Sequence, residues 1–425
     1  MPARPPDSEE IMLEEFFVVP SAAVRLRSCL FGAHLDALCS SLSALGHARH
    51  TIREKLWWIA RLARWMSKKR LDVSELNERR IDGFLGAEGR RGRRLRSGRV
   101  ALLHLLARLR TAGAVPTAPP VCDHSPGATV LARYEEHLRR ERALAASTVT
   151  RYLRLVGAFV AERLAGSTAA LRALRADEVR TFLLERASRM SPKSAQLMAG
   201  ALRSFLRFLF VRGKTRVDLA LAIPMVRQSR LVSVPRHLPC EDIEQLLVAC
   251  DLSSTTGRRD HALLLLLARL GLRAGEVIAL QLGDVRWREG EIIVRGKGKV
   301  HDRMPLLPEI GDALALYIQK DRPTGVSRHV FICRRAPHRG FSNPSSVAAI
   351  VTRALGRAGL TPPTRGAHLL RHSLATTMVK RGASFAEIGQ VLRHRSPSTT
   401  EIYAKVDLGA LREIARSWPG AGGAR

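Results

Sequence analysis

Apolar residues recur every three to four positions along most of this chain, which is the spacing of one face of an α-helix. Residues 51–66, for example, place apolar side chains on one side of a helix at Ile52, Leu56, Ile59, Ala63 and Met66. The same spacing runs from Leu35 to about Val115 and returns after residue 126. The pattern therefore predicts a mainly helical protein.

One stretch has a different period. Residues 291–306 alternate around a glycine-rich turn at Gly296-Lys297-Gly298, which is typical of a β-hairpin. Just before it, residues 259–270 are so apolar that we expect a buried helix. The fold class predicted for the whole chain is mainly α with a small β-sheet or hairpin, and the C-terminal part is an α+β domain.

The first two helical blocks resemble each other. The matching segments are Thr51-Ile52 with Thr148-Val149, residues 76–85 with 174–183, and the helix-stopping glycines Gly113 with Gly213. We interpret this match as an internal repeat of a four-helix unit, although convergent helix patterning would look similar. Two basic helical modules in tandem would extend a nucleic-acid contact along the duplex.

Proline-rich stretches separate the blocks. Residues 114–126 and 216–238 contain several prolines and read as linkers. We therefore expect an extra N-terminal helical domain at 1–120, a second helical domain at 121–225 and a C-terminal domain at 230–425.

Charge narrows the class of partner. The 425 residues include 70 Lys or Arg and 38 Asp or Glu, so the formal net charge is +32. Such an excess suits a polyanion, because each phosphate that the protein neutralises releases counterions. Double-stranded DNA is the expected partner; a general arginine bias of the source proteome is the alternative explanation.

Two features of the N-terminal block bear on that partner. Trp57, Trp58 and Trp65 could reach DNA, but their helical spacing favours packing in a core. The charged run at 86–99 is predicted to be a loop, either solvated or in contact with phosphates.

The cysteines and the lengths of the apolar runs indicate the cellular compartment in which the protein works. The six cysteines are scattered without a C-x-x-C pair, which argues against a disulfide framework or zinc ribbon and fits a reducing cytosol. Residues 1–10 lack the features of a secretory signal, and the longest apolar run, 262–268, is too short to cross a bilayer. We expect a cytoplasmic, nucleoid-associated protein with no membrane partner.

Two basic residues precede the C-terminal helices. Arg273 directly follows the buried helix, where it would either clamp a phosphate or cap helix carbonyls. Lys297 lies between two glycines at the predicted hairpin tip, where it could give a proton to a leaving alkoxide or be a plain exposed turn residue. Lys299 is a close competitor for the same role.

The densest set of chemical groups lies near the C-terminus. His368 and Arg371 are three residues apart and share a helix face, and His372 follows His368 by four. The His368–His372 spacing also suits metal ligands, but the glutamate of zinc proteases is missing and Arg371 would oppose a dication. We therefore expect no metal. His394 ends a helix that the capping box Ser384-x-x-Glu387 begins.

Tyr403 follows His394 by nine residues, after a polar turn, which predicts a short exposed segment rather than a core position. A tyrosine hydroxyl has a pKa near 10 and is a poor nucleophile at neutral pH. It becomes effective where cations hold and polarise an anionic electrophile beside it. The basic groups around Tyr403 therefore indicate transfer of a phosphate to this tyrosine.

Taken together, these motifs resemble the tyrosine recombinase (phage integrase) family over roughly residues 128–418, most specifically at 272–276, 296–299 and 368–406. The roles that this resemblance implies are phosphate binding by Arg273 and Arg371, protonation of the leaving 5′ oxygen by Lys297, acid–base help from His368, bracing of the phosphate by His394, and attack by Tyr403. It implies no cofactor. Arg393 departs from the family pattern, which usually has glycine there, and could crowd the turn before His394.

The resemblance also implies helical N-terminal DNA-binding domains that form a clamp, including a SAM-like core-binding domain. A C-terminal helix at 408–418 would dock on a neighbouring protomer. The expected assembly is a homo-oligomer, a tetramer on paired sites, with or without sister recombinases.

The functional hypothesis is site-specific DNA recombination, by which a mobile element is integrated, excised or transposed through a 3′-phosphotyrosyl intermediate. A type IB topoisomerase-like nicking–closing enzyme shares this chemistry. A basic DNA-binding protein without catalysis is the alternative from another class.

Overall fold

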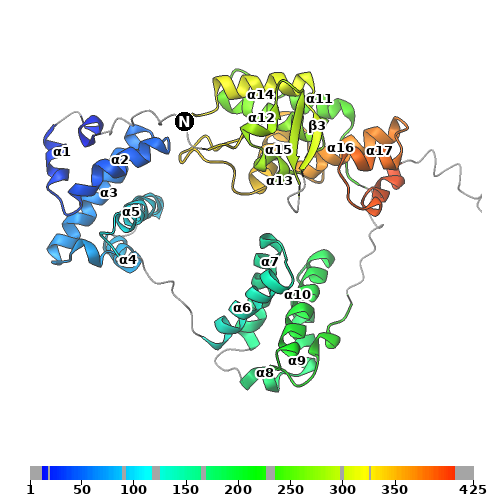
Figure 1. Cartoon of the computed structure of the whole chain (residues 1–425), viewed down its shortest axis with the longest axis horizontal. Helices are drawn as coiled ribbons and strands as arrows, with labels where there is room; N and C mark the ends of the chain where they lie inside the picture. The colour runs from blue at the N-terminus through cyan, green and yellow to red at the C-terminus, as the bar shows by residue number, and fades with distance from the viewer. Residues whose placement is uncertain are drawn as a thin grey trace, which may run out of the picture. The chain divides into compact units, whose positions relative to one another are not determined.

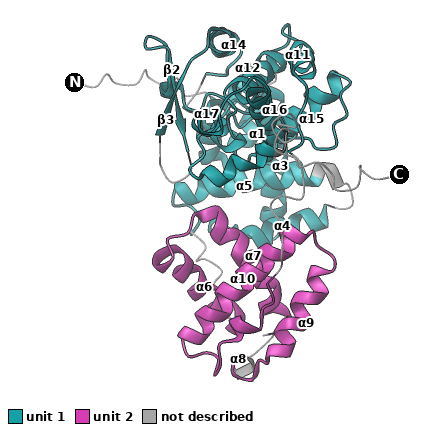
Figure 2. Cartoon of the chain, turned by 90° about the vertical axis from the view of Figure 1, so that its right-hand side faces the viewer, with its two compact units in different colours: residues 1–118, 234–425 teal, residues 119–233 magenta. Residues whose placement is uncertain are grey.

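The computed structural model of the protein describes residues 12–17, 20–88, 92–116, 125–163, 169–225, 235–296, 301–324 and 327–406 (Figure 1). The chain forms two compact units, one made of residues 1–118 and 234–425 and the other of residues 119–233 (Figure 2). The fold is mostly helical with one small antiparallel sheet, which confirms the predicted fold class. Lys297, Lys299 and the predicted docking helix at 408–418 lie outside the described residues.

The N-terminal block has its own hydrophobic core, which extends from Leu13 to Val115. Its helices are α1 (Pro20–Arg27), α2 (Leu35–Ala44), α3 (Arg49–Lys68), α4 (Glu78–Ala87) and α5 (Gly92–Thr111). The predicted loop at 86–99 is wrong for its second half, because α5 begins at Gly92. Arginine is a good helix former, and Leu95 packs against the core of the block, so the charged run joins the helix.

The second block builds a separate core around Tyr134, Phe159 and Phe205. Its helices are α6 (Pro126–Glu136), α7 (Ala146–Arg163), α8 (Ala169–Ala173), α9 (Ala176–Ala187) and α10 (Pro192–Val211). A π-helical turn, His137–Glu141, follows α6, and a 3₁₀ turn, Leu219–Ala222, packs on α10.

The two blocks share an order of helices and a type of helix end. In the first block α3 and α4 pack on α5, and in the second α7 and α9 pack on α10. Gly113 (φ 74°) and Gly213 (φ 63°) both end the last helix in the left-handed region. The residue after each glycine donates a backbone hydrogen bond to the carbonyl of Leu109 or Leu209, at 3.0 and 2.8 Å. Descent of the two blocks from a duplication stays a prediction.

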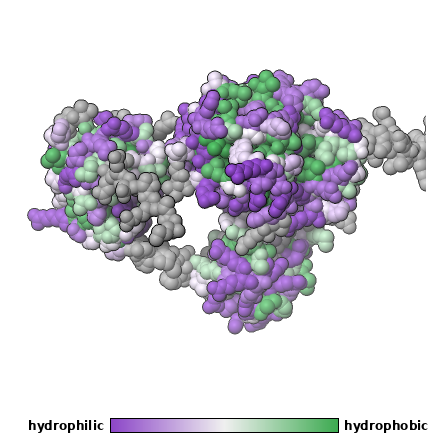
Figure 3. All heavy atoms as spheres, turned by 45° about the horizontal axis from the view of Figure 1, so that its top comes forward, coloured by the Kyte–Doolittle hydropathy of each residue, from purple (hydrophilic) through white to green (hydrophobic). Residues whose placement is uncertain are grey.

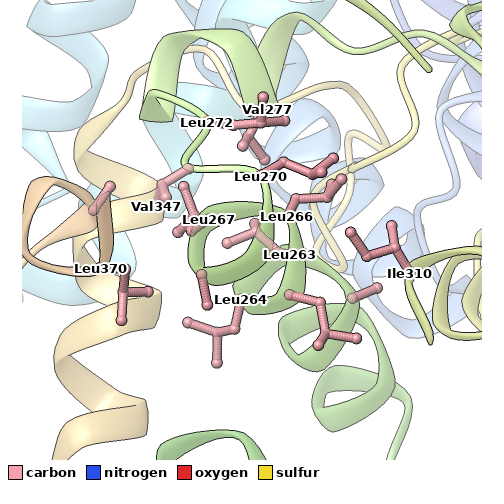
Figure 4. Packing of buried hydrophobic residues seen from close by; sticks show 14 of the residues in the cluster. Leu263, Leu264, Leu266, Leu267, Leu270, Leu272, Val277, Ile310, Val347 and Leu370 are labelled. Carbon is pink, nitrogen blue, oxygen red and sulfur yellow. The ribbon is translucent and has the colours of Figure 1, made fainter. Parts of the chain in front are cut away.

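The C-terminal domain surrounds one helix that is buried on every side. Its helices are α11 (Cys240–Val248), α12 (Thr255–Arg269), α13 (Ala274–Ala279), α14 (Pro308–Lys320), α15 (Ser345–Arg357), α16 (Ala367–Lys380) and α17 (Phe385–Val391). Residues 262–268, in α12, are all buried. Figure 4 shows Ile310 of α14, Val347 of α15 and Leu370 of α16 converging on the α12 leucines. The predicted buried helix is confirmed.

The sheet has the order β1-β2-β3 and is antiparallel. Strands β2 (Glu291–Arg295) and β3 (His301–Pro305) pair in the register Ile293↔Arg303, which confirms the predicted hairpin. The short strand β1 (Val285–Arg286) was not predicted. Ile292, Val294 and Met304 turn into the domain core, so the sheet rests on the helices by one face.

Hydrophilic side chains cover most of the visible surface of each part, with small hydrophobic areas between them (Figure 3). Among the described residues, no helix has both the length and the apolar character that a membrane span needs. The five cysteines in the described ranges are free thiols: Cys29, Cys39, Cys240, Cys250 and Cys333.

Gly98 offers a test of the α3–α5 packing. A Cβ at Gly98 would lie 2.7 Å from the Trp58 ring, whereas a Cβ at Gly83 in α4 would meet nothing within 4 Å. We expect Gly98→Ala to destabilise the N-terminal block by about 1–3 kcal/mol. Gly83→Ala should stabilise it by about 0.5–1 kcal/mol, because alanine loses less backbone freedom on folding. Urea unfolding followed by tryptophan emission measures both, and equal effects would contradict the packing described here.

Candidate active site

Arg371 is the deepest of the predicted site residues. It lies in the second turn of α16 and is 3% exposed. Its Nη1 donates to the carbonyl of Gly271 and its Nη2 to the carbonyl of Leu392. Burial, together with the nearby Arg273 and Arg393, lowers the pKa of Arg371 to about 10, so it remains a cation at neutral pH. One guanidinium thus joins α16 to the ends of α12 and α17.

Arg273 is brought to this cation by the turn between α12 and α13. Gly271 makes that turn at φ 56°, and a Cβ there would lie 2.8 Å from a methyl carbon of Leu392. Arg273 then begins α13, where its Nη1 lies 2.7 Å from Oε1 of Glu276. Its side chain is still 39% exposed. It does not cap helix carbonyls, and its guanidinium can reach a ligand in the cleft.

Arg393 occupies a backbone position that glycine adopts most easily. Its φ is 55°, in the left-handed region, where a Cβ is strained. The side chain is only 7% exposed, and its Nη2 lies 2.9 Å from Oε2 of Glu276. Glu276 thus binds Arg393 and Arg273 together. The sequence suggested that Arg393 could crowd the turn before His394. In the structure its side chain points away from the turn into an ion-pair network with Glu276.

Glu276 keeps its negative charge in this network. Its burial would raise its pKa, but the backbone N–H of Arg273 and the charge of Arg393 outweigh burial and hold the pKa below its ordinary value. A carboxylate between two guanidinium groups fixes their positions. It also leaves a net positive charge on the network.

His394 follows directly and is oriented by a neighbouring hydroxyl. Its Nδ1 lies 2.8 Å from Oγ1 of Thr400, and its backbone N–H donates to the carbonyl of Gly389 at 2.8 Å. Burial, then the charges of Arg371 and Arg273, lowers the pKa of His394 to about 4. The ring is therefore neutral at physiological pH and can act as a hydrogen-bond donor or acceptor.

A cleft of about 720 Å³ lies over these groups. Its basic lining residues are Arg273, Arg295, His368, Arg393, His394 and Arg395, and its acidic ones are Glu276 and Asp302. Gly296, the last described residue before Lys297, also lines it. The excess of cations makes the cleft suited to an anion such as a phosphate.

Tyr403 lies in a core rather than on an exposed segment, so that prediction was wrong. It belongs to the 3₁₀ turn Glu401–Val406, is 1% exposed and packs with Val379, Ile388 and Leu392. Its ring fills the space that α16 and α17 leave between them, and the polar turn before it does not reveal this burial. Burial raises the pKa of Tyr403 to about 12, although Arg371 and Arg273 act in the opposite direction.

His372 holds the tyrosine hydroxyl in this position. Its Nδ1 lies 2.7 Å from the hydroxyl oxygen of Tyr403. Burial, then the nearby His368 and Arg371, lowers the pKa of His372 to about 4, so this ring is also neutral. Sequence reasoning considered His372 only as a metal ligand, because its partner lies 31 residues away along the chain. Within the described ranges, no group of three or more His, Cys, Asp or Glu is placed to hold a metal ion.

The structure therefore brings five of the six predicted site residues into one region. Arg273, His368 and His394 line the cleft, Arg371 lies beneath it, and Tyr403 is within electrostatic range of both arginines. Lys297, the sixth, lies outside the described residues.

The chain is similar to known integrases and recombinases over most of its length. Residues 236–408 match the model of the phage integrase family, and residues 131–213 match that of the phage integrase N-terminal SAM-like domain. A putative integrase/recombinase of Sinorhizobium fredii, y4rA, is 40% identical over 379 residues, which cover 88% of this chain and 91% of y4rA. Tyrosine recombinase XerD of Listeria monocytogenes is 29% identical over 65% of this chain and 94% of its own.

Two solved structures share the fold. The XerH site-specific recombinase bound to its difH substrate, in a post-cleavage complex, has a TM-score of 0.52 and 19% identity over 68% of this chain and 96% of its own. A lambda integrase tetramer bound to a Holliday junction has a TM-score of 0.51 and 18% identity over 74% of this chain and 87% of its own.

Two substitutions at Arg393 separate backbone strain from the ion pair. Alanine and glycine both remove the bond to Glu276, but only glycine adopts the left-handed backbone freely. We expect both variants to be less stable than the wild type by about 3 kcal/mol, because a buried charge loses a partner. Arg393→Gly should be more stable than Arg393→Ala by about 1 kcal/mol. Urea unfolding measures the difference, and two variants of equal stability would argue against strain at this residue.

The neutral histidines predict a loss of stability in acid. The pKa values of His372 and His394 are lowered from 6.5 to about 4. Between pH 6.5 and 4 the unfolded chain binds more protons than the folded one, so the free energy of unfolding falls as the pH falls through this window. We expect the thermal midpoint to fall with it, and less steeply in His372→Asn and His394→Asn. An unchanged slope in both variants would show that the two rings are not buried as described.

Proposed function

Because the chain belongs to the phage integrase family of tyrosine recombinases and is a site-specific DNA recombinase, we propose that Tyr403 is its nucleophile and that the cleft described above holds the scissile phosphate. The observation that carries this assignment is the convergence of Arg273, Arg371 and two neutral histidines beside one tyrosine. Each of these groups suits phosphoryl transfer through a covalent intermediate.

The two arginines bind the non-bridging oxygens of the phosphate. Arg371 is fixed by two carbonyls, and Arg273 is fixed by Glu276 while its side chain remains partly exposed. Such preorganised cations stabilise the charge that develops in the transition state without having to rearrange during the reaction. His394 donates a further hydrogen bond from the ring edge that Thr400 does not occupy.

In the cleavage step the tyrosine oxygen forms a bond to phosphorus, and the bond from phosphorus to the 5′ oxygen breaks. The tyrosine proton passes to a base, for which His368 is placed in the cleft lining. The leaving 5′ oxygen takes a proton from Lys297. The 5′ hydroxyl of another strand then reverses these steps and releases Tyr403. Since one phosphoester replaces another throughout, neither a metal nor ATP is required.

The buried tyrosine must move before it can attack. In the free protein its hydroxyl is bonded to His372, and its pKa is about 12. Tyr403 is also absent from the residues that line the cleft. We propose that the turn Glu401–Val406 shifts when DNA binds, so that the hydroxyl leaves His372 and meets the phosphate held by the arginines.

Double-stranded DNA is the substrate, and we propose that a tetramer on paired sites carries out the exchange. The XerH structure named above is a complex with DNA, and the lambda integrase structure is a tetramer on a Holliday junction. We assign residues 121–225 as the core-binding domain and 230–425 as the catalytic domain. A topoisomerase-like enzyme and a non-catalytic binding protein are not favoured, because the matched relatives are integrases and recombinases.

A nicked duplex tests the assignment of the nucleophile. With a nick a few nucleotides beyond the cleavage point, the short fragment that carries the released 5′ hydroxyl diffuses away, so the covalent complex should accumulate. We expect wild-type protein to form a phosphotyrosyl adduct on nicked duplexes taken from the DNA that flanks its own gene. Tyr403→Phe should form none, a loss of at least 1,000-fold, yet bind the same DNA with the steep salt dependence of phosphate contacts.

Tyr152→Phe is the matched control, because Tyr152 is a partly buried tyrosine of α7 far along the chain from the site. It should form the adduct at the wild-type rate. An adduct that persists in Tyr403→Phe, or one that peptide mapping places on another residue, would refute the assignment.

A further inference from the structure

The three tryptophans of α3 have different surroundings. Trp58 is buried against Gly98, and Trp65 packs edge-on against Phe84 with ring centroids 5.8 Å apart. Trp57 instead is 48% exposed. The guanidinium of Arg61 lies over its ring, 4.7 Å from the centroid. One edge of Trp57 packs against Trp58, with ring centroids 4.9 Å apart, and the rest of the indole is open to solvent. An exposed indole with a polar N–H can take part in a contact with a partner.

Cations line the same side of α3. Arg49, Arg53, Arg64 and Lys68 are exposed and, with Trp57, follow one another at intervals of four or seven residues, so they lie on one helix face. We call these five residues the α3 basic face. None of its four cations forms an ion pair with an acidic side chain in the described part of the chain. Arg53, Trp57 and Arg64 also line a groove of about 800 Å³.

Three arginines elsewhere in this block have acidic partners. Arg80 pairs with Glu75, Arg99 with Asp82 and Arg110 with Glu78, so their charges are locally neutralised. The one acid close to the basic face along the chain, Glu54, lines the same groove and accepts a hydrogen bond from the hydroxyl of Ser97 at 2.8 Å. It forms no ion pair with a cation of the basic face in the described part of the chain, so the face keeps an excess of positive charge. The positive charge of the basic face is thus left for an external partner.

The second block also exposes cations on the corresponding helix, although not at the same positions: Arg49, Arg53 and Arg64 align with Ala146, Thr150 and Ala161. When the two blocks are aligned on Thr51 and Thr148, α3 corresponds to α7, and Trp57 corresponds to Arg154. Arg151 and Arg154 of α7 are exposed, and neither forms an ion pair with an acid among the described residues. Helix α7 lies within the match to the SAM-like domain. The same helix in two similarly built blocks therefore presents cations outward.

We propose that the α3 basic face is a second DNA-binding surface, which contacts the backbone of the duplex beyond the DNA held by the core-binding and catalytic domains. The cations would neutralise phosphates, and Trp57 with its stacked Arg61 would lie against the sugars or an opened base edge. The proposal rests on the proposed function only in that DNA is the polymer within reach. A helix of this length spans about 30 Å, or roughly nine base pairs.

Duplex length gives a direct test. Two duplexes share one core site, and the longer one adds 20 base pairs on each side. The full-length proteins are the wild type, Arg53→Ala with Arg64→Ala, and the matched control Arg80→Ala with Arg99→Ala. The control removes the same charge from the same block, but from arginines that already have acidic partners.

We expect the longer duplex to bind the wild type and the control at least fivefold more tightly than the short one. The variant of the basic face should bind the short duplex as the wild type does and lose the gain from added length. Its salt slope on the long duplex should be smaller by about two, since two phosphate contacts are removed. A variant that keeps the full gain, or a wild type that shows none, would overturn the proposal.

Further measurements show whether a change in affinity comes from the α3 basic face itself. Trp57→Phe should remove most of the change in tryptophan emission that the long duplex causes, and equal thermal midpoints should show that all variants are folded. The covalent adduct on the short nicked duplex is measured in parallel. If the adduct forms but added length has no effect on affinity, only the proposal that the α3 basic face binds DNA is refuted. If no adduct forms, the assignment of Tyr403 as the nucleophile is refuted, whatever the effect of length.

Discussion

The burial of one guanidinium organises the catalytic domain. A buried cation without acceptors would be destabilised by several kcal/mol, so Arg371 must find oxygen atoms within the fold. It finds them on the carbonyls of Gly271 and Leu392, which lie 100 and 21 residues away along the chain. Arg273 and His394 each follow one of these carbonyls by two residues. The same two hydrogen bonds that satisfy Arg371 therefore carry an arginine and a histidine to the cleft.

The close approach of these segments depends on two left-handed residues. At Gly271 the backbone is unstrained and a side chain would strike Leu392. At Arg393 the same backbone carries a side chain, and the ion pair with Glu276 offsets the strain. Glu276 also holds Arg273, so the two turns are coupled through one carboxylate. The leucine-rich helix α12 beneath them gives both turns a rigid base.

In its resting position Tyr403 stabilises the fold but is a poor nucleophile. Its ring completes a small apolar cluster, and its hydroxyl is satisfied by a neutral histidine. In that position the hydroxyl is a weaker acid than free tyrosine, so it is a poor nucleophile until it moves. The cations are already assembled without it. The reactive arrangement thus depends on one short turn rather than on a rebuilt site.

Features that depend on near neighbours along the chain could be predicted without a structure. Helical spacing, the alternation at 291–306 and the Ser384 capping box each involve residues a few positions apart, so they were predictable, as was the set of candidate side chains. The burial of Tyr403, the hydrogen bond between His372 and its hydroxyl and the ion pair of Arg393 with Glu276 could be seen only in the folded chain. These depend on contacts between residues 31 and 117 positions apart. Which of them form is set by how whole helices pack, and no local pattern records that packing.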